Sequence, residues 1–398
     1  MTVRRRRVLY IPGYDPFHPR RYRELYRKEG AAQAAVSGYA LTQAKGDTAY
    51  SWQVTAQMDG AEVEAEVEVL VWSDIVANSM SRSIPATYLQ LIRTAWAYIG
   101  TGALFRLMRL RQGPVIAALY PIVVLLVQLV VACLVGWGAA LIVDWAVGGW
   151  VGALLGVAVA LCLITVVLRW FKAKDPRIFA YYLMHDYAFS ARWRGANPPE
   201  LEARMATFAD RIAEAALSDV DEVLVVGHSS GAHLAISVLA DLIRAGRLPA
   251  GKVAFLSLGH VVPMVSFLPE ANRLRADLNV MAAQDFVAWV DVTAPGDGCA
   301  FALCDPVAVT GVSPKEQRWP LVISAAFTQT LSDRQQQELK RRYFRLHFQY
   351  LCAFDNPGDY DYFRITAGPV TLRQRFAGRA PSPSRLTRPI NTFTDMAA

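Results

Sequence analysis

The stretch that decides the fold is Val223-Leu-Val-Val-Gly-His-Ser-Ser-Gly231. Its first four residues are apolar and mostly β-branched, which predicts a buried strand, and residues 233–245 follow as a helix. Gly227 and Gly231 lie two residues before and two residues after Ser229, where larger side chains would make the strand and the helix collide. The sequence therefore predicts a sharp strand-to-helix turn that exposes the Ser229 hydroxyl at the carboxyl edge of a sheet.

Segments on both sides of this turn predict the rest of the sheet. An early apolar run stops at Pro12-Gly13, and a segment of alternating glutamate and apolar residues after Asp59-Gly60 predicts a β-hairpin with one face in water. Because strands then alternate with helices, we expect an α/β fold with a mostly parallel sheet flanked by helices. The expected strands are residues 8–11, 51–57, 62–72, 222–226, 253–258, 286–292 and 321–327, and the expected helices are residues 16–44, 198–217, 233–245 and 332–342.

A long apolar segment interrupts this pattern. Between Arg111 and Arg169 there are 57 residues, of which Asp144 is the only charged one. A helix needs about 20 apolar residues to cross the hydrocarbon core of a membrane, so the segment is long enough for two crossings. We expect a transmembrane hairpin with helices near residues 115–135 and 146–168 and a glycine-rich turn between them.

The charges around this hairpin predict its orientation. Arginine and lysine residues precede the segment and follow it, whereas the turn contains neither. Because positive flanks favour the cytoplasmic side, we expect the body of the protein and both termini in the cytoplasm, at the inner membrane if the source is bacterial. The alternative, a buried helical hairpin inside a soluble core, is disfavoured because core helices seldom run this far without polar residues.

Small residues recur at every fourth position of the second apolar helix, at Gly148, Gly152 and Gly156. Such a stripe lets another helix backbone approach closely. The approaching helix is either the first helix of the same hairpin or a helix of a second copy of the chain.

Composition narrows the classes of partner. The chain has 398 residues, 54% of them apolar, and its 41 Lys and Arg residues against 34 Asp and Glu give a net charge of +7. No basic stripe interleaved with aromatic residues is present, so nucleic acid is not an expected partner and the lipid bilayer is. The five cysteines have no metal-binding spacing, and neither a His-Glu-x-x-His motif nor a Gly-rich phosphate loop occurs, so no metal and no cofactor are expected.

The Gly-His-Ser-Ser-Gly turn resembles the nucleophile elbow of the α/β-hydrolase superfamily, which includes serine esterases, lipases and thioesterases. The resemblance covers most of the chain outside the apolar hairpin and the C-terminal tail, so the hairpin is interpreted as an insertion into a hydrolase fold. It divides the chain into residues 1–111, the N-terminal part of that fold; 112–169, the transmembrane hairpin; 170–367, the C-terminal part with the elbow; and 368–398, an extended or disordered tail.

This resemblance implies a triad whose members follow in the chain order serine, acid, histidine. Ser229 corresponds to the nucleophile. Asp297 lies in the loop after the strand at 286–292 and corresponds to the acid, with Asp305 as the alternative. His347 is the only histidine after the acid and corresponds to the base.

The resemblance also implies an oxyanion hole made of two backbone N–H groups. The residue after the nucleophile, Ser230, provides the first. Tyr14, in the loop that closes the first strand, is the candidate for the second. Pro12 stands in that loop where related proteins carry a histidine, so the match there is loose.

Together these features predict a membrane-anchored serine hydrolase that cleaves an ester or a thioester, with an acyl lipid as the suggested substrate. The same residues could transfer the acyl group to an acceptor other than water. The alternative from a different class is a hydrolase-fold membrane scaffold or interaction protein without turnover.

Overall fold

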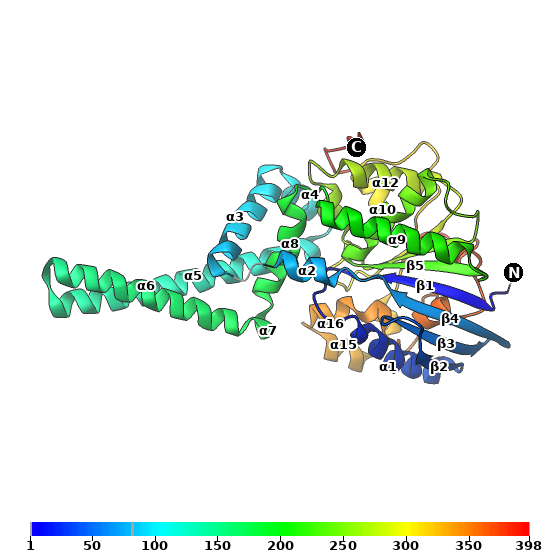
Figure 1. The fold of residues 1–398 in the computed structure, drawn as a ribbon, viewed down its shortest axis with the longest axis horizontal. Helices are drawn as coiled ribbons and strands as arrows, with labels where there is room; N and C mark the ends of the chain where they lie inside the picture. The colour runs from blue at the N-terminus through cyan, green and yellow to red at the C-terminus, as the bar shows by residue number, and fades with distance from the viewer. Residues whose placement is uncertain (1, 81–82, 398) are drawn as a thin grey trace.

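The computed structural model describes residues 2–80 and 83–397. An eight-stranded sheet forms the centre of the body, in the order β2-β3-β4-β1-β5-β6-β7-β8 (Figure 1). Strand β3 is antiparallel to both neighbours, and every other adjacent pair is parallel. This confirms the prediction of an α/β fold with a mostly parallel sheet. The strands are β1 (Arg5–Ile11), β2 (Ala40–Lys45), β3 (Ser51–Met58), β4 (Ala61–Val69), β5 (Glu222–His228), β6 (Val253–Leu258), β7 (Ala288–Thr293) and β8 (Leu321–Ser324).

Helices cover both faces of the sheet, because the central strands are apolar on both sides. In β5, Val223 and Val225 join the core on one face, and Leu224 and Val226 join the core on the other. The first core is closed by α9 (Pro199–Leu217), α10 (Ser230–Arg244) and α12 (Asn272–Ala283), and the second by α1 (Arg20–Ser37), α17 (Tyr362–Ala367) and α18 (Leu372–Arg375).

The apolar hairpin projects from this body as two helices, α5 (Gln112–Val147) and α6 (Gly149–Ala173) (Figure 1). Both are long and apolar enough to cross a membrane. The expected helix limits were wrong: α5 continues through residues 136–146, and the turn is confined to Gly148 and Gly149, whose φ angles are 70° and 63°. Gly136 does not end α5 because it packs on α6, where an added Cβ would lie 2.9 Å from the Ala160 carbonyl oxygen.

The stripe of small residues on α6 faces α5. A Cβ atom added to Gly156 would lie 2.9 Å from the Ala140 carbonyl oxygen, and one added to Gly152 would lie 3.2 Å from a carboxylate oxygen of Asp144. In this chain the close helix approach is therefore made within the hairpin.

A neck of helices lies between the sheet and the hairpin, and it comprises α2 (Ser73–Ser79), α3 (Ile84–Gly100), α4 (Ala103–Leu110) and α8 (Ala180–Arg192). The carboxyl ends of the parallel strands point toward this neck (Figure 1). The remaining elements are α7 (Asp175–Ile178), α11 (Val262–Ser266), α13 (Pro306–Thr310), α14 (Phe327–Thr330), α15 (Asp333–Leu339), α16 (Tyr343–His347) and η1 (Gln349–Leu351).

The N-terminal helix is shorter than the expected residues 16–44. It ends at Ser37 because Gly38 adopts a left-handed conformation with φ of 72°, and the chain then forms the edge strand β2. The hairpin between β3 and β4 turns at Asp59 and Gly60, both with positive φ, as the Asp-Gly pair predicts.

The tail from residue 368 runs along the body rather than away from it. The N–H groups of Val3, Ser382 and Leu386 pair with the carbonyl groups of Pro369, Val322 and Leu303. The buried Arg6 guanidinium also donates to the Gly368 carbonyl at 2.6 Å. The tail is thus mostly extended, with α18 as its helix.

Candidate active site

The turn after β5 places Ser229 in a strained conformation. Its φ is 56° and its ψ is −121°, a region that residues other than glycine rarely adopt, and its side chain is partly exposed. A Cβ on Gly231 would lie 2.0 Å from the Ile11 carbonyl oxygen, and one on Gly227 would lie 2.7 Å from the Cα of Ala232. Only glycine fits at these two positions, so the predicted strand-turn-helix unit is present.

The loop that follows β1 lies directly against this turn. A Cβ on Gly13 would lie 3.0 Å from the Ser229 Cβ and 3.4 Å from its Oγ. Two side chains fix the loop through its carbonyl groups: the Trp72 indole donates to Pro12 at 2.9 Å, and the Tyr182 hydroxyl donates to Tyr14 at 2.5 Å.

These contacts leave backbone N–H groups available beside the serine. Neither the Tyr14 N–H nor the Ser230 N–H forms a hydrogen bond with another residue that the structure describes. Ser230 also begins helix α10, whose N-terminus carries partial positive charge. The two predicted donors therefore lie on the two segments that meet at Ser229.

The structure joins His347 to Asp297. The His347 Nδ1 lies 2.7 Å from Asp297 Oδ2, which also accepts a hydrogen bond from the Tyr350 hydroxyl at 3.0 Å, and Oδ1 accepts one from the Cys299 N–H at 2.9 Å. Burial acts to raise the pKa of Asp297, but His347 and these hydrogen bonds outweigh it and hold the pKa below its ordinary value. The carboxylate is therefore ionised and fixes the imidazole orientation.

The other nitrogen of this imidazole is uncommitted. His347 Nε2 is buried and has no hydrogen-bond partner among the described residues, and it makes no hydrogen bond to Ser229 in this structure. The neighbouring His228 holds the ring beside the turn: the ring centroids are 4.9 Å apart, and His228 Nε2 donates to the His347 carbonyl at 3.0 Å. Burial and the nearby His347 lower the pKa of His228 to about 3, so His228 stays neutral.

The alternative acid lies elsewhere. Asp305 caps helix α13 by accepting hydrogen bonds from the Val307 and Ala308 N–H groups, and Gln317 donates to its other oxygen. The hydrogen bonds of Asp305 therefore hold the local fold. Of the two candidate acids, only Asp297 is hydrogen-bonded to His347.

A carboxyl group that the sequence analysis did not single out lies near the same histidine. Asp186, on helix α8, makes no hydrogen bond to another described residue. Burial raises the pKa of Asp186 to about 7, and the nearby His347 opposes this rise. Helix α8 also carries Tyr182, which holds the Tyr14 loop. The sequence of α8 carries no motif that would predict these roles of Asp186 and Tyr182. The only available signal was the position of this helix shortly after the hairpin.

The same centre holds three potential metal ligands. One potential ligand atom from each of Asp297, Cys299 and His347 lies within 4.8 Å of the other two. Burial, together with the negative charges of Asp297 and Asp186, raises the pKa of the Cys299 thiol and disfavours the thiolate that would bind a metal. A metal there would also break the His347–Asp297 hydrogen bond, so the arrangement fits an acid-base pair better.

A partly exposed serine on a strained turn, a histidine oriented by an ionised aspartate and two free N–H groups are the parts that acyl transfer through a serine requires. Comparisons of this chain with protein-family models, with curated proteins and with solved structures found no match.

Proposed function

We propose that this protein is a membrane-anchored serine hydrolase that cleaves an ester or a thioester. The observation that carries the proposal is the His347–Asp297 pair, whose second ring nitrogen is left free beside the strained turn at Ser229. A buried unpaired nitrogen costs free energy, which favours a role for His347 Nε2 toward the serine or a substrate.

The chemistry follows from these roles. His347 Nε2 takes the proton of the Ser229 hydroxyl as its oxygen attacks the substrate carbonyl carbon, and the imidazolium then gives that proton to the leaving alcohol or thiol. The product of this half-reaction is an acyl ester on Ser229. Water, deprotonated by the same imidazole, attacks that ester, and the imidazolium returns the proton to the Ser229 oxygen as the acid leaves, which restores the serine.

The oxyanion formed in both steps needs hydrogen-bond donors. The N–H groups of Tyr14 and Ser230 are proposed for this role, because both are unpaired and come from the segments that meet at Ser229. Such donors are worth roughly 3 kcal/mol each when they are aimed at the developing charge.

We also propose that the body of the chain has an α/β-hydrolase fold. Three features agree with such a fold. They are the chain order Ser229, Asp297, His347, the elbow between β5 and α10, and the loop after β1, which is a parallel neighbour of β5. The hairpin α5–α6 is then an insertion between the oxyanion strand and the nucleophile strand.

Membrane anchoring is proposed from the surface of the hairpin. Large apolar side chains such as Leu154, Trp145 and Trp150 are 62%, 88% and 76% exposed. Their exposure to water would be unfavourable by about 25 cal/mol for each Å² of apolar surface, which immersion in lipid removes. The arginine and lysine residues at the body end of both helices support a cytoplasmic location for the body, because positive flanks favour that side.

The function is tested by turnover of the purified full chain in detergent micelles. p-Nitrophenyl butyrate and an acyl thioester are offered to the wild type and to Ser229→Ala. We expect the Ser229→Ala variant to lose roughly 10⁴-fold or more in kcat. Equal rates for the two proteins would remove Ser229 from the mechanism.

The anchor is tested by labelling introduced cysteines in intact and permeabilised cells with a membrane-impermeant maleimide. Trp150→Cys lies near the tip of the hairpin, and Leu217→Cys, at a position 80% exposed on the body, is the matched control. We expect the first to react in intact cells and the second only after permeabilisation. The same reactivity for both would contradict the proposed orientation.

A further inference from the structure

A basic segment lies between α15 and the candidate base His347. It comprises residues 340–345, Lys-Arg-Arg-Tyr-Phe-Arg, and its four cationic side chains are all exposed. None of the four forms an ion pair with a carboxylate among the residues that the structure describes, whereas Arg334, earlier in the same region, pairs with Glu338 at 3.1 Å. The cations of the segment are therefore available to anions from outside the chain.

Two aromatic contacts place the basic segment against the body ends of both hairpin helices. The Tyr343 ring lies on Gly298, because a Cβ there would be 3.4 Å from its Cδ1, and Gly298 in turn packs on Gly113 at the start of α5. The Phe344 ring lies 5.5 Å from the ring of Phe179, which follows α7. Figure 1 accordingly shows α16 near α7, on the side of the body from which the hairpin projects.

Two exposed tryptophans on α6 mark the expected limits of the hydrocarbon core. Trp150 and Trp170 are 76% and 57% exposed. Trp170 follows Trp150 by 20 residues, which is about 30 Å of helix and matches the thickness of the core, and tryptophan favours both of its interfaces. Lys172, Lys174 and Arg177 come next, so the end of α6 and the helix α7 are expected at the level of the lipid headgroups.

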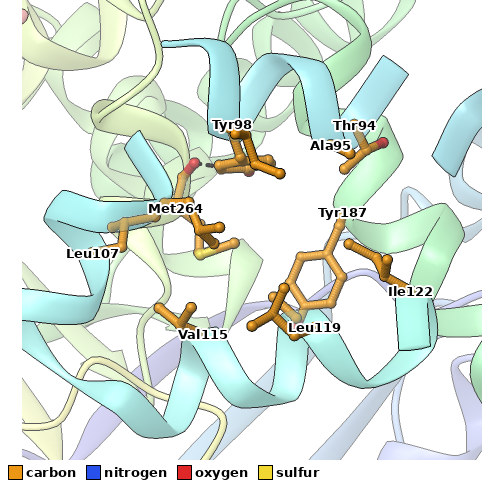
Figure 2. Close-up of a pocket in the computed structure, with 12 residues that line it drawn as sticks. Thr94, Ala95, Tyr98, Leu107, Val115, Leu119, Ile122, Tyr187 and Met264 are labelled. Atoms are coloured by element: carbon orange, nitrogen blue, oxygen red, sulfur yellow. Dashed lines mark hydrogen bonds between the residues drawn. The ribbon is translucent and has the colours of Figure 1, made fainter. Parts of the chain in front are cut away.

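Contacts at the neck fix this level relative to the body. Figure 2 shows Leu119 of α5, Tyr98 of α3 and Tyr187 of α8 around one small apolar space. The Tyr120 hydroxyl, also on α5, donates to the Ile178 carbonyl at 2.7 Å. Because α5 is thus joined both to the neck and to the chain that follows α6, the basic segment beside Phe179 is expected next to the headgroups.

Anionic phospholipid is the partner that fits this position. Guanidinium groups bind phosphate oxygens in a bidentate manner, and each basic residue near an anionic membrane surface raises the affinity about 5-fold. A zwitterionic headgroup offers the same phosphate but cancels its charge. Tyr343, which is 59% exposed between the cations, adds a ring of the kind that favours the membrane interface.

We propose that residues 340–345 dock onto anionic phospholipid headgroups of the membrane that holds the hairpin, as a third point of contact beside the ends of α5 and α6. This inference rests on the proposed membrane anchoring and does not depend on the proposed hydrolysis. Because α16 ends at His347, the docked segment also ties the candidate base to the membrane surface.

Hydrogen exchange of the full chain in nanodiscs tests this surface. Nanodiscs of phosphatidylcholine alone are compared with nanodiscs that contain about 30% phosphatidylglycerol. We expect the peptide that covers residues 340–346 to exchange at least about 10-fold more slowly in the anionic bilayer, and about 0.5 M NaCl to remove most of this difference. A peptide that covers β5 should exchange equally in both bilayers, which controls for folding.

Two matched double variants assign the effect to the segment. Arg341→Gln with Arg342→Gln should reduce the difference between the bilayers to about 2-fold or less. Arg5→Gln with Arg247→Gln removes the same charge at the opposite edge of the sheet, where both residues are paired with aspartates, and should preserve the difference.

Equal exchange of the wild-type segment in the two bilayers would overturn the inference, as would a difference that survives in the Arg341→Gln, Arg342→Gln protein. If about 10 mM inorganic phosphate slowed exchange in phosphatidylcholine nanodiscs as much as phosphatidylglycerol does, the segment would bind free anions and membrane docking would be refuted. If Trp150→Cys and Leu217→Cys react alike with the maleimide, the anchoring itself has failed. The expected maleimide reaction together with equal exchange fails this inference alone.

Discussion

Two histidine–aspartate pairs lie at the carboxyl edge of the same sheet, and they differ in whether the imidazole keeps a ring nitrogen without a hydrogen-bond partner. In the first pair, His347 gives Nδ1 to Asp297 at 2.7 Å and keeps Nε2 unpaired. In the second, His260 Nε2 donates to the Cys304 carbonyl at 3.1 Å, and its Nδ1 accepts from the Val262 N–H at 3.3 Å. His260 lies 3.6 Å from Asp291, beyond hydrogen-bond length.

The pKa values of the two carboxyl groups are shifted in opposite directions. Burial acts on both, but the hydrogen bonds from His347, Tyr350 and Cys299 keep the pKa of Asp297 below its ordinary value. Asp291 receives one hydrogen bond, from the Ser257 hydroxyl at 2.6 Å, and burial raises its pKa to about 6. Contact between histidine and aspartate therefore does not identify an acid-base pair. The proposed acid-base pair is distinguished instead by an ionised acid and a free second nitrogen.

The largest expected effect comes from exchanging each histidine for glutamine. His347→Gln removes the proposed base, so we expect kcat with p-nitrophenyl butyrate to fall by roughly 10⁴- to 10⁶-fold. His260→Gln keeps an amide near the Cys304 carbonyl and should change kcat by less than about 3-fold in the folded fraction. Steady-state kinetics on both variants, with thermal melting as the control for folding, checks this contrast. Comparable losses in two folded variants would contradict the distinction between the pairs.

The next largest effect concerns the acids. Asp297→Asn cannot hold His347 in the required tautomer or balance its charge, so a loss of about 10⁴-fold in kcat is expected. Asp291→Asn touches no proposed reacting group, and its effect is expected in stability and not in kcat. The same kinetic assay compares kcat for the two variants. An Asp297→Asn variant with a kcat near that of wild type would refute the proposed acid.

A smaller effect is expected from the hydroxyl group that supports each carboxylate. Tyr350→Phe removes the hydrogen bond to Asp297 and leaves the Ala294 N–H, which Tyr350 accepts at 3.0 Å, unpaired. We expect a 3- to 10-fold loss of kcat together with a free energy of unfolding lower by about 1 to 3 kcal/mol. Ser257→Ala removes the hydroxyl group that donates to Asp291, and it should lower the free energy of unfolding without changing kcat. A kcat loss in Ser257→Ala as large as that in Tyr350→Phe would argue against this assignment.

The smallest effect is the pH dependence of stability, which should have opposite sign for the two acids. The raised pKa of Asp291 means that the folded wild type binds the proton more tightly than the unfolded chain, so wild type loses stability relative to Asp291→Asn as pH rises from about 4 to about 6. The lowered pKa of Asp297 adds stability that is present above about pH 4 and is lost as pH falls. Melting temperatures of wild type and Asp291→Asn between about pH 4 and pH 7, and of wild type and Asp297→Asn between about pH 2.5 and pH 4.5, test the two slopes, and slopes of equal sign would contradict the account.

Sequence could predict those parts of the site that short-range constraints determine. The glycines around Ser229 predict the strained turn. The triad order implied by the resemblance selects His347, and the loop after a predicted strand suggests Asp297, with Asp305 left as the alternative. It could not predict β2, because that edge strand is mostly exposed and has no apolar alternation; the left-handed Gly38 was the available signal. The helix α8 with Tyr182 was also missed.

These misses share a physical cause. Tyr182 acquires its role from a contact with Tyr14, which is 168 residues away in the chain and reaches it only after the hairpin has folded back. The length of α5 was underestimated for a related reason, because Gly136 remains helical where it packs on Ala160 of α6. Local sequence patterns contain no information on such contacts between distant segments.

The central claim is that Ser229 is a nucleophile activated by His347, and its most direct test is reaction with a fluorophosphonate probe followed by peptide mapping. We predict phosphonylation of wild type at Ser229, none in Ser229→Ala, strongly slowed reaction in His347→Gln and unchanged reaction in His260→Gln. Absence of label in folded wild type, or label that survives the loss of Ser229, would contradict the claim and leave a membrane-bound scaffold as the better description.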